Sequence, residues 1–219
     1  MPTYNRAKWI SLAIECYLQQ TFTDSELVIL DNGDDETESV VPAHPRIRYY
    51  KQPGQKLNTG EIRNRVNELA QGEIVCHWDD DDWSAPNRIE TQVARLLSSG
   101  KQVTGYHSIS YWDTSSNRAP EDRAHIYQGT ASYACGTSQL YFKNWWTQHP
   151  FNTKAVGEDS DFSHAAKCSK QLDSVDGRQM IVARAHSDST CPAPLGSSSF
   201  PRVRLPDMPQ AFLEAVGVK

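Results

Sequence analysis

The chain has 219 residues, of which 38% are hydrophobic and 22% charged, and this is the composition of an ordinary globular protein. Its formal net charge of −5 argues against a nucleic-acid partner, because binding to the phosphate backbone depends on basic side chains. No apolar run approaches the roughly 18 residues of a membrane span, and the N-terminal stretch lacks the apolar segment of a signal peptide.

The first half of the chain alternates short apolar runs with segments of helical periodicity. Such alternation predicts an α/β fold with a mostly parallel central sheet that helices cover on both faces. The predicted elements begin with a helix over 6–20 and strands over 26–30 and 46–51. A second helix, which is closed by Gly72 and followed by a strand over 73–78, is marked by Ile62, Val66, Leu69 and Ala70. A third helix starts near Pro86 and ends before Gly100, and its apolar face carries Ile89, Val93, Leu96 and Leu97.

The second half of the chain is less regular, and the change falls near residue 107. We expect one domain without linkers, ending in a loop-rich tail over 191–219 that is rich in proline and serine. The predicted elements here are strands over 102–112, 137–143 and 179–185, and short helices over 143–148 and 159–168.

The five cysteines are odd in number and contain no C-x-x-C pair, so neither a zinc site nor a disulfide framework is expected. Reduced thiols are typical of the cytoplasm, which is where we expect the protein, with peripheral attachment to the inner face of a membrane left open.

The segment "WDDDDW" places four carboxylates, Asp79 to Asp82, between Trp78 and Trp83 at the end of a predicted strand. In a parallel sheet, ligands gather at the carboxyl ends of strands, where Asp31 also lies. Like charges about 4 Å apart repel by roughly 1 kcal/mol even in water. Either the carboxylates spread into solvent, as a loop before a helix, or a hard divalent cation neutralises them. The flanking tryptophans favour the binding of a cation, because a loop that only extends into solvent has little use for two indole rings.

Four segments occur in an order that resembles the family 2 glycosyltransferases, which have the GT-A nucleotide-sugar fold. They are "PTYNR" (2–6), "VILDNGDD" (28–35), "GEIRNRVNELAQGEIVCHWDDDDW" (60–83) and "GEDSDF" (157–162). The resemblance covers roughly residues 2–190. It implies a metal-dependent enzyme of the hexosyltransferase type, which moves a sugar from a UDP-, GDP- or dTDP-sugar to a hydroxyl of a glycan, lipid-linked or protein acceptor, with inversion at the anomeric carbon.

The resemblance also implies a role for each matching position. Residues 1–106 would form the nucleotide-sugar half, and residues 107–190 the acceptor and catalytic-base half. The nucleotide side would be lined by Pro2, Thr3, Tyr4, Arg6, Asp31, Arg63, Asp79 and Asp81. The family's D-x-D motif would correspond to Asp79, Asp81 and Asp82, and Mn²⁺ or Mg²⁺ would be held by Asp81, Asp82 and His186. The catalytic base would be Glu158 or Asp159.

These roles fit the chemistry of glycosyl transfer. A divalent cation neutralises the diphosphate that leaves, and a carboxylate takes the proton of the attacking hydroxyl, which is worth about 10²- to 10⁴-fold in rate. Ordinary alternatives stay open: Arg63 could pair with a surface acid, His186 and His77 could be hydrogen-bonded within the fold, and Trp145 and Trp146 could pack in the core rather than stack on an acceptor sugar.

The chain departs from the family in one respect. Family members carry an apolar first strand before "PTYNR", and here that strand is expected to be missing or shortened. This feature favours one alternative, a degenerate GT-A domain that binds nucleotide or glycan without transfer. A sugar-phosphate nucleotidyltransferase is disfavoured because the chain has no glycine-rich phosphate loop, and an acidic interaction protein without a small ligand is the remaining alternative.

Overall fold

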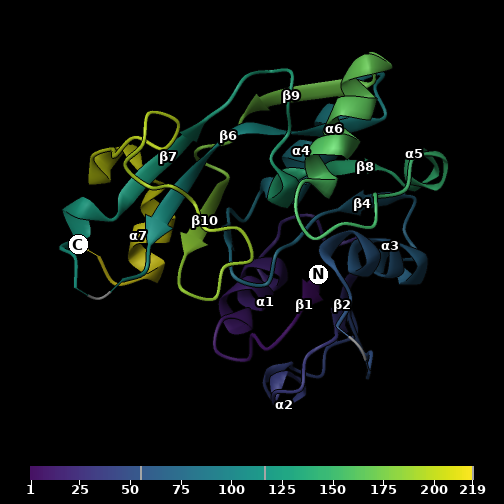
Figure 1. Cartoon of the computed structure of the whole chain (residues 1–219), viewed down its shortest axis with the longest axis horizontal. Helices are drawn as coiled ribbons and strands as arrows, with labels where there is room; N and C mark the ends of the chain where they lie inside the picture. The colour runs from purple at the N-terminus through teal and green to yellow at the C-terminus, as the bar shows by residue number, and fades with distance from the viewer. Residues whose placement is uncertain (55, 116, 219) are drawn as a thin grey trace.

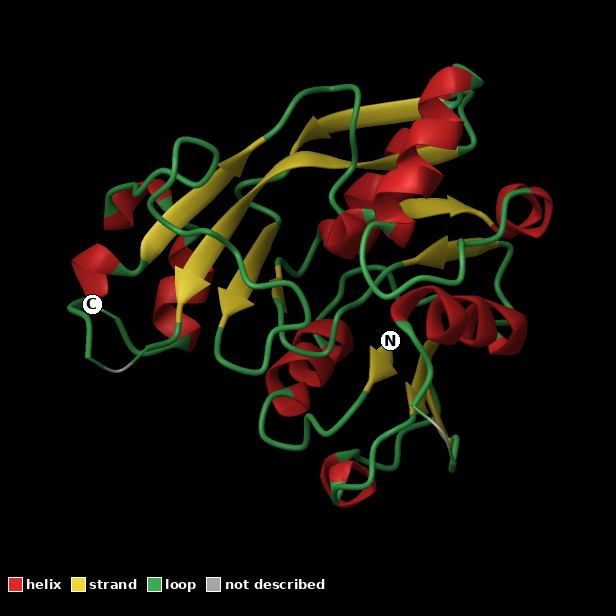
Figure 2. Cartoon of the chain, in the orientation of Figure 1, coloured by secondary structure: helices red, strands yellow, loops and turns green. Residues whose placement is uncertain are grey.

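The computed structural model describes residues 1–54, 56–115 and 117–218. Figures 1 and 2 show helices packed around two β-sheets. The first half of the chain forms β1 (Pro2–Thr3), α1 (Ile10–Leu18), β2 (Leu27–Asp31), α2 (Thr37–Val40), β3 (Ile47–Lys51), α3 (Thr59–Leu69), β4 (Ile74–Cys76), β5 (Trp83–Ser84) and α4 (Arg88–Ser99).

The second half begins with the longest strand, β6, and ends in a short helix near the C-terminus (Figure 1). Its elements are β6 (Val103–Asp113), the 3₁₀ turn η1 (Pro120–Asp122), β7 (Ala124–Gln128), η2 (Gly136–Ser138), β8 (Leu140–Phe142), α5 (Lys143–Gln148), α6 (Glu158–Cys168), β9 (Leu172–Asp176), β10 (Ile181–Ala185), η3 (Leu205–Asp207) and α7 (Gln210–Ala215).

The smaller sheet is parallel and has the order β1-β2-β3. All five residues of β2 are buried, as expected of a parallel strand that is covered on both faces. The two-residue strand β1, which lies within the "PTYNR" segment, pairs Pro2 with Leu30 and Thr3 with Asp31. The last two residues of β2 therefore have a neighbouring strand at both edges.

The larger sheet corrects the prediction of a mostly parallel sheet, because within the described residues it is mixed. Its order is β4-β8-β6-β10-β5, and β7 and β9 also pair with β6. Strand β6 runs parallel to β9 and β10 but antiparallel to β7 and β8. Only residues 114–123 join β6 to β7, whereas a parallel neighbour needs a crossover of a dozen or more residues.

The predicted helices are present with corrected limits. The first covers Ile10–Leu18 rather than 6–20, and the one expected near Pro86 begins at Arg88. Its C-terminal residue is followed by Gly100 at φ 66°, a left-handed conformation that suits glycine. Leu97, predicted to lie on the apolar face of this helix, is 62% exposed, because the buried face is formed by Ile89, Gln92 and Leu96 instead.

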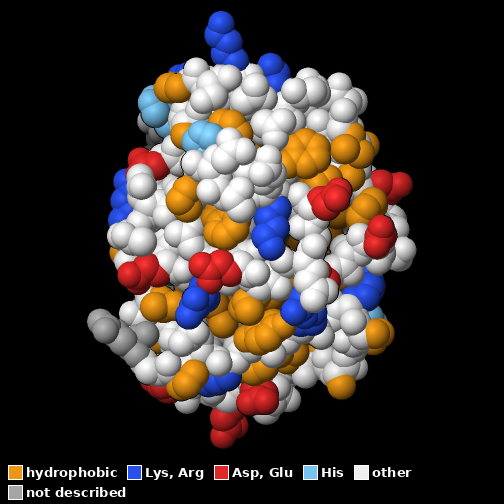
Figure 3. All heavy atoms as spheres, turned by 90° about the vertical axis from the view of Figure 1, so that its right-hand side faces the viewer, with side chains coloured by type: hydrophobic (Ala, Val, Ile, Leu, Met, Phe, Trp, Pro, Cys, Tyr) orange, Lys and Arg blue, Asp and Glu red, His pale blue; other side chains and the backbone are white. Residues whose placement is uncertain are grey.

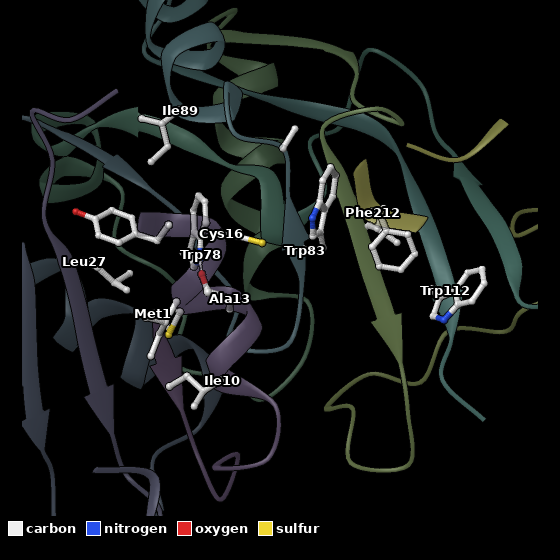
Figure 4. Packing of buried hydrophobic residues seen from close by; sticks show 14 of the residues in the cluster. Met1, Ile10, Ala13, Cys16, Leu27, Trp78, Trp83, Ile89, Trp112 and Phe212 are labelled. Carbon is white, nitrogen blue, oxygen red and sulfur yellow. Dashed lines mark hydrogen bonds between the residues drawn. The ribbon is translucent and has the colours of Figure 1, made fainter. Parts of the chain in front are cut away.

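The tail over 191–219 is not entirely loop, because it contains α7 as well as η3. Helix α7 is held by Phe212, which is fully buried and packs edge-on against Trp83 and Trp112 at ring-centroid distances of 5.9 and 5.5 Å. Figure 4 shows these three rings side by side. The proline and serine content of the tail concealed this helix, which depends on contacts with distant strands.

Both tryptophans that flank the acidic segment are buried in the main apolar cluster, at 3% and 5% exposure for Trp78 and Trp83. The indole of Trp78 donates a hydrogen bond from Nε1 to the carbonyl of Ala13 in α1, at 2.9 Å (Figure 4). Buried aromatic rings of this size dominate the energetics of a core. The acidic turn is thus anchored at both of its ends.

On the face that carries α3 and α5, acidic and basic side chains are interspersed with apolar ones (Figure 3). Within the described residues, no helix is long and apolar enough to cross a membrane. Trp145 and Trp146 of α5 are both buried, at 7% and 8% exposure, which agrees with a packing role for this pair.

Candidate active site

The acidic turn over 79–82 joins β4 to β5, and its four carboxylates contact different partners. The carboxylate of Asp81 accepts a hydrogen bond from Arg6 at 2.6 Å and one from His186 Nε2 at 3.0 Å, both at Oδ2. Burial alone would raise the pKa of Asp81, but the hydrogen bonds from His186 and Arg6 outweigh it and lower the pKa. Asp81 is therefore an anion held between two nitrogen groups.

The carboxylate of Asp82 is turned to other partners. Its Oδ2 accepts a hydrogen bond from the Thr137 hydroxyl at 2.8 Å, and its Oδ1 accepts one from the backbone N–H of Arg184 at 3.2 Å. Asp82 is only 6% exposed, and burial raises its pKa well above the usual range. These contacts fix the end of the turn to η2 and β10.

The other two acids of the turn differ in environment. Asp80 is 7% exposed, and burial together with the neighbouring charge of Asp81 raises its pKa to about 7. Asp79 is half-buried and lies 3.6 Å from the guanidinium of Arg63, measured from Oδ1 to a terminal nitrogen.

Arg63 of α3 connects the acidic turn to the start of α6. Its Nε donates to Glu158 Oε1 at 3.0 Å, and a terminal nitrogen lies 2.9 Å from His77 Nδ1. Burial alone would lower the pKa of Arg63, but the charges of Asp79 and Glu158 outweigh it and raise the pKa. His77 also contacts the Gly136 carbonyl at 2.7 Å, so it belongs to this buried network.

The two candidate bases lie side by side but are not equivalent. Glu158 is 3% exposed and bound to Arg63, and its burial raises its pKa. Asp159 is half-buried, and its Oδ2 accepts a hydrogen bond from the Tyr133 hydroxyl at 3.1 Å. A Cβ added to Gly136 would stand 2.5 Å from Asp159 Oδ2, so the bare glycine of η2 makes room for this carboxylate.

Asp31 ends β2 and is fully buried. Its Oδ2 accepts hydrogen bonds from the Tyr49 hydroxyl at 2.6 Å and from Lys51 Nζ at 2.8 Å, and its Oδ1 accepts one from the Gly33 backbone N–H at 2.7 Å. The hydrogen bond to Asp31 raises the pKa of Lys51. The predicted base-binding aspartate is thus held rigidly by three neighbours.

The "PTYNR" segment leads from β1 to α1 and lies beside the turn that follows β2. Pro2 and Thr3 form β1, and Tyr4 stacks under the Lys56 ammonium at 4.0 Å from its ring centroid. Asn5 adopts φ 56°, and its Oδ1 accepts hydrogen bonds from the backbone N–H groups of residues 34 and 35. The segment is fixed so that Arg6 reaches Asp81.

His186 follows β10, and its ring stacks on that of Trp9. The ring centroids are 4.0 Å apart, and the Trp9 indole N–H donates to Asp188 Oδ2 at 3.1 Å. The backbone N–H of Asp188 donates to His186 Nδ1 at 3.1 Å, so Nε2 carries the proton that is donated to Asp81.

Of the sequence-predicted site residues, the structure joins Arg6, Asp81 and His186 in one cluster and Arg63, Asp79 and Glu158 in another. The turn η2, which contacts both Asp82 and Asp159, bridges the two regions. Sequence reasoning missed four residues that position these groups: Trp9, Gly136, Thr137 and Arg184. Of these four, only Arg184 lies in a segment that the sequence had marked for the site, "ARAHS" (183–187).

A divalent cation finds suitable donor types at Asp81 and His186. Among the described residues, no group of three or more His, Cys, Asp or Glu side chains is arranged to hold a metal by itself. Mg²⁺ commonly binds through one or two carboxylates together with substrate phosphates, and Asp81 supplies such a carboxylate. Ligation through Nε2 requires the proton to move to Nδ1 and the contact with the Asp188 N–H to open.

Comparison with known proteins found a matching protein family and several related sequences. A profile described as Glycosyl transferase family 2 matches residues 1–164. The chain is 34% identical over 110 residues to the GalNAc(5)-diNAcBac-PP-undecaprenol beta-1,3-glucosyltransferase of Campylobacter jejuni, a match that covers 48% of this chain and 36% of that protein. It is 33% identical over 95 residues to the chondroitin synthase of Escherichia coli, covering 41% and 14%. The matches span less than half of these relatives.

Solved structures show the same fold at low sequence identity. TarS 1-349 of S. aureus in complex with UDP-GlcNAc superposes with a TM-score of 0.69 at 18% identity, covering 86% of this chain and 58% of that one. The mannosyltransferase PcManGT of Pyrobaculum calidifontis, in complex with GDP-Man and Mn²⁺, gives a TM-score of 0.64 at 18% identity, with coverage of 86% and 56%. At this identity the likeness concerns the α/β GT-A-like fold alone.

Proposed function

Because the chain belongs to glycosyl transferase family 2, we propose that it transfers a sugar from a nucleoside-diphosphate sugar to an acceptor hydroxyl, with inversion at the anomeric carbon. The observation that carries the proposal is the contact of Arg6 and His186 with Asp81 at the carboxyl ends of β1 and β10. Ligands of α/β sheets bind at this edge. Donors of the UDP-, GDP- and dTDP-sugar classes all contain the diphosphate that such a cluster suits.

The nucleotide would lie over the first half of the chain, residues 1–106. Asp31 at the end of β2 and the "PTYNR" segment would contact the base and ribose, with Thr3, Tyr4 and Arg6 along the entrance. Arg63 and Asp79 would hold the donor from the side of α3. Since Asp31 is rigidly bound by Lys51 and Tyr49, its lone pairs would be presented in a fixed direction.

The diphosphate would lie next to Asp81 and His186, which would hold Mn²⁺ or Mg²⁺ together with the phosphate oxygens. Such an ion, when bound, neutralises charge on the leaving group. Arg6 would add a second positive charge when its contact with Asp81 is loosened. Asp82, bound to Thr137 and Arg184, would position the turn rather than act as a ligand.

The catalytic base would be Asp159 rather than Glu158. Glu158 is occupied by Arg63 in a buried ion pair, whereas Asp159 is half-buried and does not share that ion pair. A base acts when it lies within hydrogen-bond reach of the acceptor hydroxyl, and the Tyr133 hydroxyl helps to orient this carboxylate. The attacking oxygen and the leaving diphosphate would then lie on opposite sides of the sugar.

Donor turnover tests the proposal. The purified chain is incubated with UDP-, GDP- and dTDP-sugars and Mn²⁺, and release of the nucleoside diphosphate is measured with and without a mixture of acceptors. We expect turnover with one donor class, a loss of at least about 10²-fold in Asp81→Asn, and little change in Asp173→Asn, whose carboxylate pairs with Arg95 at the surface.

The outcomes separate the proposal from its alternative. A non-catalytic domain would bind a nucleotide, seen as a rise in melting temperature, but would release no diphosphate from any donor. Equal rates in the parent protein and in Asp81→Asn would also contradict the proposal, because turnover would then arise elsewhere.

A further inference from the structure

Strand β7 lies at an outer edge of the larger sheet (Figure 1). A cavity of about 500 Å³ lies beside it. It lies where the chain returns along the edge of β7 that does not pair with β6. There the backbone N–H of Ile126 donates to the carbonyl of Pro201, and that of Val203 donates to the carbonyl of Ala124. Its volume is within the range of about 300–1,000 Å³ that is typical of small-molecule sites. The lining residues are Arg118, Asp122, His125, Leu195, Gly196 and Arg202.

His125 is the unusual member of this lining. It is 2% exposed, and its Nδ1 lies 3.3 Å from the Phe200 carbonyl oxygen, to which it donates. Its Nε2 is buried and has no hydrogen-bond partner within the described parts of the chain. Buried polar atoms are almost always hydrogen-bonded, so Nε2 is expected to have a water molecule or a ligand hydroxyl as its partner.

The chemistry of the cavity distinguishes between ligand classes. With the proton on Nδ1, a neutral His125 offers Nε2 as an acceptor, and an acceptor needs a ligand that donates a hydrogen bond. The two arginines are already neutralised, since Arg118 pairs with Asp113 at 3.1 Å and Arg202 pairs with Asp122. A surface that mixes paired donors and acceptors with apolar Leu195 fits a polyhydroxyl ligand better than an anion.

Aromatic rings connect this cavity to the candidate base. The Tyr133 hydroxyl bonds Asp159, the Tyr127 ring lies 6.3 Å from the Tyr133 ring, and Tyr127 lies 5.1 Å from Phe200, between ring centroids. The three rings are each half-buried and therefore partly accessible. The apolar faces of the three rings suit the C–H faces of sugar rings, and the hydroxyl groups of the two tyrosines suit sugar hydroxyls.

We propose that the cavity beside β7 is a subsite for a glycosyl unit of a saccharide acceptor, with His125 Nε2 accepting a hydrogen bond from one of its hydroxyl groups. The chain of the saccharide would extend over Phe200, Tyr127 and Tyr133 toward Asp159. This inference rests on the proposed function for the identity of the ligand as an acceptor, but binding of the saccharide requires no donor and no turnover.

Binding is therefore tested without a nucleotide. The protein is applied to a printed array of defined di- to hexasaccharides, and the strongest binder is titrated by calorimetry. His125→Asn keeps a donor at the position of Nδ1 and removes Nε2, so we expect binding about five- to tenfold weaker. His125→Gln places an amide near the position of Nε2 and should retain part of the affinity.

A control variant tests whether charge at the surface alone explains any change. Arg204→Gln removes a positive charge from a neighbouring residue that does not line the cavity and is 82% exposed, and it should bind as the parent does. Arg202→Gln, which alters the lining, should weaken binding. Circular dichroism confirms that each variant is folded before it is titrated.

Two results would overturn the inference: no saccharide on the array binds, or binding is equal in the parent and in His125→Asn. Each of these results is compatible with donor turnover, which is measured separately. Conversely, saccharide binding that depends on His125 without any donor turnover would uphold the subsite and remove the proposed transferase activity.

Discussion

Arg63 and Glu158 are 95 residues apart in the sequence, yet their side chains form a buried ion pair, with Nε and Oε1 separated by 3.0 Å. The same guanidinium lies 3.6 Å from Asp79. One side chain of α3 therefore pairs with an acid of the turn and with an acid at the start of α6. Without Arg63, the buried Glu158 would lose its ion-pair partner.

Removal of Arg63 should destabilise the fold strongly. Loss of one partner of a buried ion pair leaves an uncompensated charge and costs about 3–5 kcal/mol. We expect Arg63→Met to lower the free energy of unfolding by about this amount in a urea titration. Arg65→Met on the same helix breaks an exposed pair with Glu68 and should change it by less than about 0.5 kcal/mol.

A double variant tests the coupling between the two charges. Glu158→Gln should also destabilise, but Arg63→Met combined with Glu158→Gln should cost less than the sum of the two single changes, because neither charge is then left alone. Additive losses would mean that the two side chains do not interact in solution.

Gly136→Ala should affect catalysis more than stability. The added Cβ would stand 2.5 Å from Asp159 Oδ2, and the carboxylate, at the end of a short side chain, would have to turn away. We expect kcat for transfer to fall by about 10²-fold or more, since a base must stay within reach of its proton, while KM for the donor changes little.

The background variant Asp159→Asn supplies the control for that prediction. Once the base is removed, Gly136→Ala should cause no further loss in rate. If it lowers the rate equally in both backgrounds, the glycine acts on some group other than Asp159.

Cation binding should depend on His186. Mn²⁺ is titrated calorimetrically into protein saturated with the nucleoside diphosphate of its donor, and His186→Ala should weaken the affinity by about 10-fold or more, because one of two protein donors is lost. His164→Ala, at an exposed site on α6, should bind the ion as the parent does. An unchanged affinity in His186→Ala would place the ion elsewhere.

Stability should depend on pH through Glu26. Burial alone would raise the pKa of Glu26, but hydrogen bonds from Arg48 and the backbone of Gln71 outweigh it and lower the pKa below its ordinary value of 4.5. A lowered pKa contributes stability that is present above pH 4.5 and is lost as the pH falls through the pKa of the folded state.

The variant Glu26→Gln should therefore be less stable than the parent by about 1 kcal/mol at pH 7, a value reduced by the partial exposure of the pair. The difference between the two proteins should shrink below pH 4.5. Urea titrations at several pH values measure it, and a difference that is constant with pH would show that the carboxylate charge is not responsible.

The parts of the fold that the sequence predicted are those with strong local patterns. The apolar run of β2 and the helical period of α4 each identify an element. Burial on two faces requires a continuous apolar run, and burial along one stripe requires apolar residues at helical spacing. Strand β9, with the sequence LDSVD, has neither pattern, since its residues are half polar and its place is set by pairing with β6.

The candidate site could be proposed from the sequence where a motif contains the residue types that the chemistry needs. The aspartates of the turn and the acids of "GEDSDF" are recognisable because their residue types are unusual in that order. Thr137 and Gly136 were not, because a threonine and a glycine in a turn are common, and their role arises only when η2 is brought against Asp82 and Asp159. That proximity is a property of the tertiary structure.

Strand β6 is hydrogen-bonded to β7, β8, β9 and β10, and the last of these ends at Ala185. During synthesis, the central strand must therefore wait for its last partner until 185 residues have left the ribosome, and His186 can meet Asp81 only after that. The edge of β6 that pairs with β9 and β10 would stay without its full set of partners for this interval, about 4–15 s at common elongation rates over the last 70–80 residues. A chain truncated between Asp113 and Ile181 would leave the segment of β6 that pairs with β10 as an open sheet edge, which favours aggregation.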